Sequence, residues 1–236
     1  MTDLLGKALL DYHNGKYTED LITSTNISED DELPLPYLFR NFAEMPKLEQ
    51  FALKKCRGTI LDVGCGAGSH SLWLQEKGFQ VKAIDISAGA IEVARARGIQ
   101  KTEQTHILAI SEEKFDTILL LMNGTGIFET VEKTNKYLQH LKSILNPNGQ
   151  ILIDSSDLQY MYDRNDDGSI WVPQERYYGE LEFTMSYKGE TTPTFPWLYL
   201  HEALCKQLAE ANGLTFGILK RGENFDYLAR LTASNN

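Results

Sequence analysis

Residues 59–70 read Thr59-Ile60-Leu61-Asp62-Val63-Gly64-Cys65-Gly66-Ala67-Gly68-Ser69-His70, a short apolar strand that runs into a glycine-rich turn. An amphipathic helix is predicted to follow over residues 71–77. Glycines at positions 64, 66 and 68 allow backbone dihedrals that are closed to other residues, and a ligand can approach them without meeting a Cβ atom. The free N–H groups of the helix start point into the same space. The pattern therefore predicts a nucleotide-binding turn.

A second predicted strand, within residues 79–87, ends on Asp85, which stands 21 positions after Gly64. In a strand-helix-strand unit this spacing places a carboxylate where it can accept both ribose hydroxyls of an adenosine. The dinucleotide fingerprint G-x-G-x-x-G requires a glycine at position 69, where this chain has Ser69. Instead the glycines alternate, and Asp62 stands two residues before the first of them.

This alternating form resembles motif I of the class I S-adenosylmethionine-dependent methyltransferases, usually written LDVGCGxG, and residues 61–68 match it throughout. The resemblance implies that the turn passes the methionyl part of S-adenosylmethionine and that Asp85 holds the ribose. Cys65 could be taken for a nucleophile, but we interpret it as a small side chain that fits beside the cofactor. The expected cofactor-binding residues are Asp62, Gly64, Cys65, Gly66, Gly68, Asp85, Ile86 and Asn123.

Two later stretches extend the resemblance. Residues 115–126 form an apolar strand and a loop containing Asn123, similar to motif IV, which faces the transferring methyl group. The Asn-Pro-Pro-Tyr form used on nucleobase amines is missing. Residues 145–149 resemble the L-x-P-G-G turn into strand five, with Asn148 in place of the first glycine. The third strand is expected at His106–Ile110, and the adenine contact stays open among Glu103, Gln104 and Ser111.

The first 57 residues are predicted to form an N-terminal helical lid, with a helix over residues 2–13. Residues 18–32 are polar and acidic, which favours a mobile segment or lid hinge. Tyr37 and Arg40 are candidate acceptor contacts, with core packing for the tyrosine and a surface pair for the arginine as the alternatives.

Residues 156–197 are an insertion, and the period-two pattern over residues 177–187 predicts a hairpin over the acceptor site. Tyr177 and Tyr199 are candidate substrate contacts. We predict no metal site: residues 163–168 resemble a calcium loop, but Gln174 stands where that loop needs a glutamate. A general base is useful only for an acceptor that carries a proton. The candidates are His201, Asp154 and Tyr178, and no pattern singles one of them out as catalytic.

Composition narrows the class of protein. The chain has 236 residues, 42% hydrophobic and 24% charged, as expected for one globular domain with an insertion. Three cysteines without C-x-x-C spacing disfavour disulfides and zinc. The net charge of −10 disfavours nucleic acid. Without an apolar span or secretion signal, we expect no membrane partner and a cytoplasmic monomer or homodimer.

The order of elements predicts an α/β fold with a doubly wound sheet of parallel strands and a terminal hairpin. The resemblance implies a seven-stranded, Rossmann-like sheet whose last strand is antiparallel, with the methyltransferase domain at residues 58–236. It also implies methyl transfer to a small-molecule acceptor, with S-adenosyl-L-homocysteine as product. Two alternatives stay open: a nicotinamide-dependent oxidoreductase on a related fold, and a non-catalytic protein that binds S-adenosylmethionine.

Overall fold

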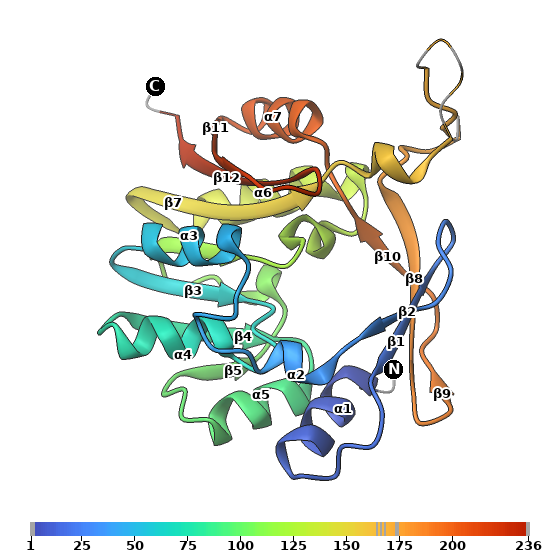
Figure 1. The fold of residues 1–236 in the computed structure, drawn as a ribbon. Coiled ribbons are helices and arrows are strands. Elements are labelled where there is room, and N and C mark those ends of the chain that lie inside the picture. The colour runs from blue at the N-terminus through green and yellow to red at the C-terminus, as the bar shows by residue number, and fades with distance from the viewer. Residues whose placement is uncertain (1–2, 164, 166, 168, 173–174, 235–236) are drawn as a thin grey trace.

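A computed structural model describes residues 3–163, 165, 167, 169–172 and 175–234. Its centre is a seven-stranded sheet in the order β11-β12-β7-β6-β3-β4-β5 (Figure 1). Strand β12 is antiparallel to β7 and β11, and the other neighbours are parallel. The predicted doubly wound sheet with an antiparallel last strand is confirmed. The strands are β3 (Thr59–Val63), β4 (Gln80–Asp85), β5 (Thr102–Gln104), β6 (Phe115–Leu120), β7 (Leu145–Ser156), β11 (Leu214–Arg221) and β12 (Asp226–Ala233).

Helices cover both faces of this sheet, because its strands are apolar on both sides. Along β3, Ile60 packs in the cluster of α3 and α4, whereas Leu61 packs in the cluster of α6 and α7. Helix α5 packs on β4 and β5, and the side chain of Ser87 caps its first turn as predicted. The helices are α3 (Lys47–Lys55), α4 (Ser69–Glu76), α5 (Ala88–Ala96), α6 (Val131–Ser143) and α7 (Glu202–Ala211).

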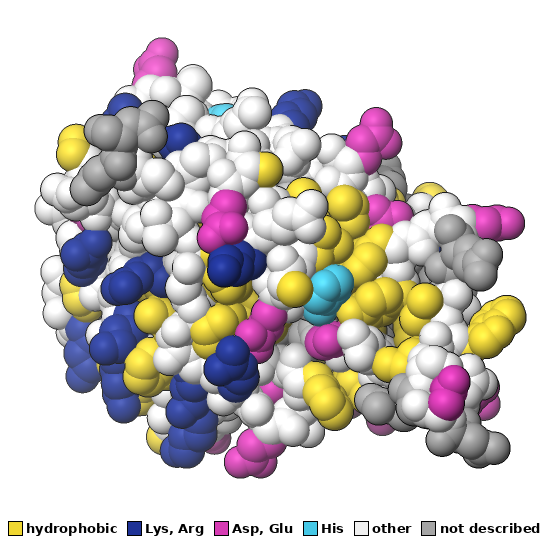
Figure 2. Space-filling view, turned by 90° about the horizontal axis from the view of Figure 1, so that it is seen from above, with side chains coloured by type: hydrophobic (Ala, Val, Ile, Leu, Met, Phe, Trp, Pro, Cys, Tyr) yellow, Lys and Arg dark blue, Asp and Glu magenta, His cyan; other side chains and the backbone are white. Residues whose placement is uncertain are grey.

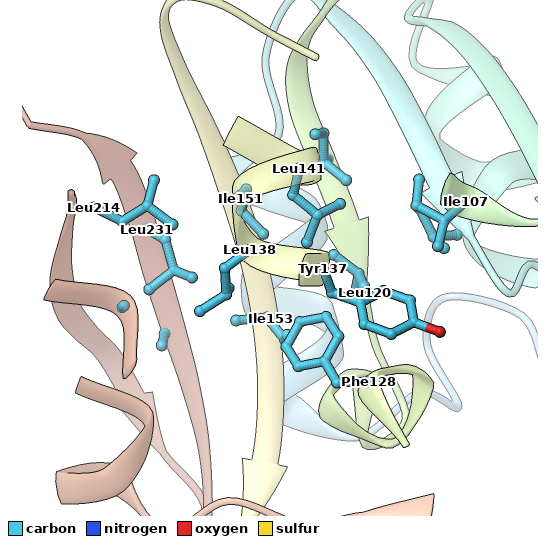
Figure 3. Packing of buried hydrophobic residues seen from close by; sticks show 14 of the residues in the cluster. Ile107, Leu120, Phe128, Tyr137, Leu138, Leu141, Ile151, Ile153, Leu214 and Leu231 are labelled. Atoms are coloured by element: carbon cyan, nitrogen blue, oxygen red, sulfur yellow. The ribbon is translucent and has the colours of Figure 1, made fainter. Parts of the chain in front are cut away.

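The α6 side holds the largest apolar cluster. Tyr137, Leu138 and Leu141 of α6 point from the helix towards Ile151 and Ile153 of β7 (Figure 3). All five side chains are buried, so this cluster anchors the middle of the sheet.

A second, antiparallel sheet stands beside the carboxyl ends of the central strands (Figure 1). It joins the N-terminal strands β1 (Leu21–Thr25) and β2 (Asp31–Leu33) to the inserted strands β8 (Glu180–Tyr187), β9 (Glu190–Thr191) and β10 (Phe195–Leu198). The hairpin predicted in the insertion is confirmed, since β8 and β9 pair across the turn at residues 188–189.

The expectation of a mobile segment at residues 18–32 is wrong. Ile22 and Thr25 of β1 pair with Ser186 and Phe183 of β8, more than 150 positions away. A strand partner so distant leaves no local pattern. Acidic residues 29–32 lie in the β1–β2 turn and the start of β2, and Glu19 and Asp20 precede β1. Helices α1 (Leu4–His13) and α2 (Leu35–Leu38) flank this hairpin.

The third central strand was also predicted at the wrong place. It is Thr102–Gln104, and Ile107–Ala109 form a single 3₁₀ turn, η1. The apolar residues of that turn pack beneath α6 instead of lying in the sheet, as buried Ile107 shows. An apolar run of this length does not by itself separate a buried strand from a buried turn.

Seen from the side of α7 and β12, the surface is divided (Figure 2). Lysine and arginine side chains gather on one half, and hydrophobic side chains surround a histidine on the other. Across the described ranges, no helix is long and apolar enough to cross a membrane. Within those same ranges, no group of three histidine, cysteine or acidic side chains could hold a metal ion. The loop considered for calcium includes Arg164, Asp166, Gly168 and Gln174, which lie outside the described residues.

Candidate active site at the carboxyl edge of the central sheet

The glycine turn adopts the conformation that its sequence requires. Gly64, Gly66 and Gly68 have φ angles of 72°, 53° and 82°, in the left-handed region. The N–H groups of Gly64 and Cys65 both donate to the carbonyl of Ile84 in β4, at 2.9 and 3.0 Å. A Cβ atom at Gly66 would meet nothing within 4 Å, so the turn has open space above its main chain.

Asp85 lies at the end of β4, directly beside this turn. One carboxylate oxygen accepts from the Gly66 N–H and the other from the Ser87 N–H, both at 2.9 Å. Burial raises the pKa of this carboxyl, while the two N–H donors oppose the shift. Each oxygen keeps a further lone pair, so the carboxylate can accept a hydrogen bond from each of the two ribose hydroxyls. The next side chain, Ile86, is 70% exposed and offers an apolar surface at the same edge. An adenosyl group fits this pairing of an acid with an exposed apolar side chain.

Asp3, which the sequence analysis missed, fixes helix α1 beside Asp85. Its carboxylate accepts from the Gly6 N–H in its own helix and from the Ser87 hydroxyl and Gly89 N–H of α5, at 2.8–3.0 Å. The two helices touch backbone to backbone, because a Cβ atom at Gly89 would lie 2.5 Å from Gly6. The only sequence signal for this contact was an acid at a helix N-cap.

Asp62 lies buried in the sheet beneath the turn. Its carboxylate accepts from the Ser71 hydroxyl at 2.6 Å, which ties β3 to α4, and burial raises its pKa. Asp62 therefore supports the turn from below.

Asp154, near the end of β7, clamps the loop after β6. Its carboxylate accepts from the N–H groups of Gly124 and Met122, at 2.8 and 3.1 Å. Met122 and Asn123 both have φ near 60°, so the clamp holds a left-handed loop. Burial, with a smaller contribution from the Glu49 charge, raises the pKa of Asp154 to about 7.

The side chain of Asn123 bonds within the protein. Its amide nitrogen donates to the Leu198 carbonyl at 3.1 Å, and its oxygen accepts from the hydroxyls of Thr125 and Ser155. These bonds join the loop to strand β10 of the second sheet. Asn123 thus connects the two sheets, and its predicted contact with the cofactor remains a prediction.

The predicted substrate residue Tyr199 stands between Leu198, whose carbonyl accepts from Asn123, and Leu200, whose N–H donates to the hydroxyl of Ser155, the residue after Asp154. Tyr37 comes from α2 and Tyr199 follows β10. Burial raises the pKa of both phenols, to about 12 for Tyr199, and the Asp154 charge contributes to each shift. The fold therefore brings the segment of Tyr199 to the end of β7 that carries Asp154.

Arg40 belongs to a buried network instead of a surface pair. The same Glu49 oxygen accepts from Arg40 Nη2 at 2.5 Å and from His70 Nε2 at 2.7 Å. The arginine also donates to the Tyr37 carbonyl and lies 4.0 Å from the centre of that ring. Burial opposes ionisation of Glu49, yet its bonds to His70 and Arg40 hold its pKa below the ordinary value. Arg40 Nε is buried and has no partner among the residues described.

Sequence reasoning missed Glu49 and His70. Glu49 shares the buried face of α3 with Ala52 and Leu53, and an acid at such a position was the available signal. His70 stands in the first turn of α4, directly after the glycine turn.

The other candidates form a separate cluster beyond the end of β7. The Tyr177 hydroxyl bonds His201 Nδ1 at 2.8 Å, and Tyr178 donates to Asp157 at 2.8 Å. The Tyr178 ring stacks on His201 with centroids 5.7 Å apart. These contacts bring together the predicted His201, Tyr177 and Tyr178, whereas Asp154 bonds to the loop after β6.

Comparisons with known proteins match this geometry. A family model described as a methyltransferase domain matches residues 37–215. The chain is 40% identical to a crystallised S-adenosylmethionine-dependent methyltransferase from Bacteroides fragilis, bound to S-adenosyl-L-homocysteine. That match has a TM-score of 0.92 and covers 99% of this chain and 95% of the other.

Curated relatives match more weakly. The chain is 31% identical over 190 residues to the glycine/sarcosine N-methyltransferase of Halorhodospira halochloris, covering 76% of this chain and 65% of that enzyme. It is 25% identical over 130 residues to the tRNA U34 carboxymethyltransferase of Idiomarina loihiensis, covering 50% of this chain and 37% of that enzyme. The chain therefore spans less than two thirds of the length of either relative.

Proposed function

Because the chain belongs to the S-adenosylmethionine-dependent methyltransferases and shares their cofactor, we propose that it methylates an amine nitrogen of a small-molecule acceptor held beside Asp154. The observation that carries this proposal is the buried carboxyl of Asp154, which holds the loop after β6 and lies, with the segment of Tyr199, at the same sheet edge as the glycine turn. Family membership removes the nicotinamide-dependent alternative.

The cofactor residues act mainly by binding and orientation. S-adenosylmethionine supplies a methyl group on a sulfonium, which needs no metal and no covalent enzyme intermediate. Main chain at Gly64 and Gly66 leaves room for the bound molecule, and Asp85 accepts the ribose hydroxyls. Ile86 covers an apolar face of the adenosyl group. Cys65 is small enough to fit beside the cofactor. Burial raises the pKa of its thiol and keeps it protonated, which disfavours a role as nucleophile.

An amine suits the acceptor side because that side is rich in acids and tyrosine rings. Carboxylates and aromatic faces both attract an ammonium group. The charge of Arg40 is already matched by Glu49, so it does not attract an anionic acceptor. An ammonium must lose a proton before its nitrogen can react, and a carboxyl with a pKa of about 7 is suited to accept that proton near neutral pH. The relative from Halorhodospira halochloris is named an N-methyltransferase, which supports nitrogen as the atom that receives the methyl group.

A small acceptor is supported by the second sheet and by the charge of the chain. That sheet stands beside the carboxyl edge, and the net charge of −10 opposes a polyanion (Figure 1). A cytoplasmic location, a monomeric or homodimeric state and the domain boundary at residue 58 remain predictions from the sequence.

Transfer of a labelled methyl group tests this proposal. The purified protein is incubated with methyl-labelled S-adenosylmethionine and a panel of matched primary amines, alcohols and carboxylates. We expect label in amines alone, with a rate that rises with pH and levels off above an apparent pKa of about 7.

The Asp154→Asn variant is expected to lose that pH dependence, whereas Asp157→Asn, which alters the bonds to Tyr178 and to the Gln159 N–H, keeps it. Label in alcohols would exclude the amine. Binding of S-adenosyl-L-homocysteine without transfer to any compound would favour the non-catalytic alternative.

A further inference from the structure

An exposed pair of aromatic rings lies at the sheet edge that carries the acceptor residues. Tyr160 and Phe225 are 51% and 58% exposed, and their rings stack with centroids 5.4 Å apart and planes 13° apart. Tyr160 belongs to the 3₁₀ turn η3 (Leu158–Met161) after β7, and Phe225 directly precedes β12. The Asp157 N–H donates to the Phe225 carbonyl, which joins the two segments. On this side of the molecule hydrophobic side chains surround a histidine (Figure 2).

Phe225 occupies a backbone position that suits a much smaller residue. Its φ angle is 59°, in the left-handed region that glycine and asparagine adopt with least strain. It lies in the tight turn between β11 and β12, where the Gly222 N–H donates to the Asp226 carbonyl at 2.8 Å. A glycine would adopt this backbone conformation without strain, and the exposed ring of Phe225 is not part of the buried core. Strain and exposure at one residue point to a role in binding.

The stacked pair is continuous with the proposed reaction centre. Asp226, which directly follows Phe225, pairs with Ser156 of β7, and Leu228 pairs with Asp154. The exposed rings and the buried acid are therefore only a few positions apart on two paired strands. A second stack, Tyr178 on His201, lies beyond Asp157 on the same side.

We propose that Tyr160 and Phe225 form a platform for the flat, apolar body of the acceptor, so that the substrate is an arylalkylamine whose nitrogen points towards Asp154. This inference rests on the proposed function and names its substrate class. Aromatic rings bind other rings through offset stacking, in addition to the apolar area that they bury. An acceptor with a short aliphatic body would leave both rings in water.

Two amines of equal charge test the platform. Labelled methyl transfer is measured with 2-phenylethylamine and with n-butylamine. We expect a KM about tenfold lower for 2-phenylethylamine, because stacking and burial of one ring supply that difference. The Phe225→Gly and Tyr160→Ala variants should each raise the KM for 2-phenylethylamine about fivefold or more and leave that for n-butylamine unchanged.

Phe225→Gly also separates binding from folding. Glycine accepts the left-handed backbone, so this variant should melt at or above the wild-type temperature. Tyr17→Ala removes an exposed tyrosine that bonds Asp20 at the edge of the lid and serves as the matched control. It should leave the ratio of the two KM values unchanged.

The outcomes distinguish this inference from the proposed function. Equal KM values for the two amines in the wild-type protein, or a ratio that Phe225→Gly leaves unchanged, overturn the platform and leave amine methylation standing. An equal rise in the KM for both amines in the Phe225→Gly and Tyr160→Ala variants also overturns the platform, because the rings would then have no selective role. Transfer to neither of these amines nor to any amine of the earlier panel, with S-adenosyl-L-homocysteine still bound, overturns the proposed function and the platform together.

Discussion

The two sides of the candidate site are built in different ways. The cofactor side uses residues 59–104, whose strands and helices follow one another along the chain and present mainly backbone groups. The proposed acceptor side would use side chains from three distant segments: Tyr37, Asp154 and Tyr199. A backbone turn imposes strict residue choices at each position, whereas a side-chain pocket only requires that distant segments meet. This difference explains why the cofactor can be identified from a short motif and the acceptor cannot.

Glu49 lies where the two sides meet, and its removal should have the largest effect. The Glu49→Ala variant leaves the buried Arg40 guanidinium without its carboxylate and removes the partner of His70. We expect the free energy of unfolding to fall by about 3–5 kcal/mol, as for other broken buried pairs. Urea denaturation measures this change.

The double variant Arg40→Leu/Glu49→Leu is the matched control. Because it removes both charges, it should recover much of the lost stability. A loss below about 1 kcal/mol for Glu49→Ala alone would mean that the two sides are joined by other contacts.

Asp154, on the proposed acceptor side, should make the free energy of unfolding depend on pH. Its folded pKa of about 7 lies above the ordinary value of 3.8, so the unfolded chain releases this proton at lower pH than the folded protein. The stabilisation is complete below pH 4 and is lost as the pH rises towards 7. Relative to Asp154→Asn, the wild-type protein should lose roughly 2–3 kcal/mol of stability between pH 5 and pH 8.

Denaturation of both proteins across this pH range measures the difference. Asp116→Asn is the control, since the Thr59 N–H holds the pKa of Asp116 below its ordinary value and the carboxyl is ionised in both states above pH 5. Parallel curves for wild type and Asp154→Asn would refute the raised pKa.

Asp85 should affect the cofactor side alone. Asp85→Ala removes the carboxylate that is expected to accept the ribose hydroxyls and that already holds the Gly66 and Ser87 N–H groups. The affinity for S-adenosyl-L-homocysteine should fall by about 1–3 kcal/mol, or roughly 5- to 150-fold. Calorimetry with wild type, Asp85→Ala and Asp85→Asn measures this. Unchanged affinity in the alanine variant would remove the ribose assignment.

Cys65 should show the smallest effect, because its position in the turn contributes backbone and small size. Its thiol is buried, and burial raises its pKa, so we expect it to stay protonated and take no nucleophilic part. Cys65→Ala should change the affinity for S-adenosyl-L-homocysteine by less than about 0.5 kcal/mol and leave methyl transfer intact. Loss of methyl transfer with unchanged affinity for S-adenosyl-L-homocysteine would show that the thiol has a chemical role. The cofactor side would then not act through backbone groups and small size alone.

Strand positions show where prediction from sequence works. The elements at 59–63 and 80–85 were predicted closely because apolar runs there are bounded by glycines and an acid. Asn148 could replace a glycine because asparagine tolerates the left-handed φ of 62° found there. Residues 106–110 were wrongly predicted as a strand, because a buried 3₁₀ turn and a buried strand are equally apolar.

By itself, the sequence determined the glycine turn, the strands at 59–63 and 80–85 and the acid beside the turn, because these rest on contacts within one short stretch of chain and on backbone angles that few residues adopt. Tertiary structure alone decided the pairing of β1 with β8, the burial of Arg40 with Glu49 and His70, and the bonds that bring residues 198–200 to Asn123 and Ser155. These contacts join segments far apart in sequence, and their energy comes from burial and charge pairing that exist only once the chain has folded.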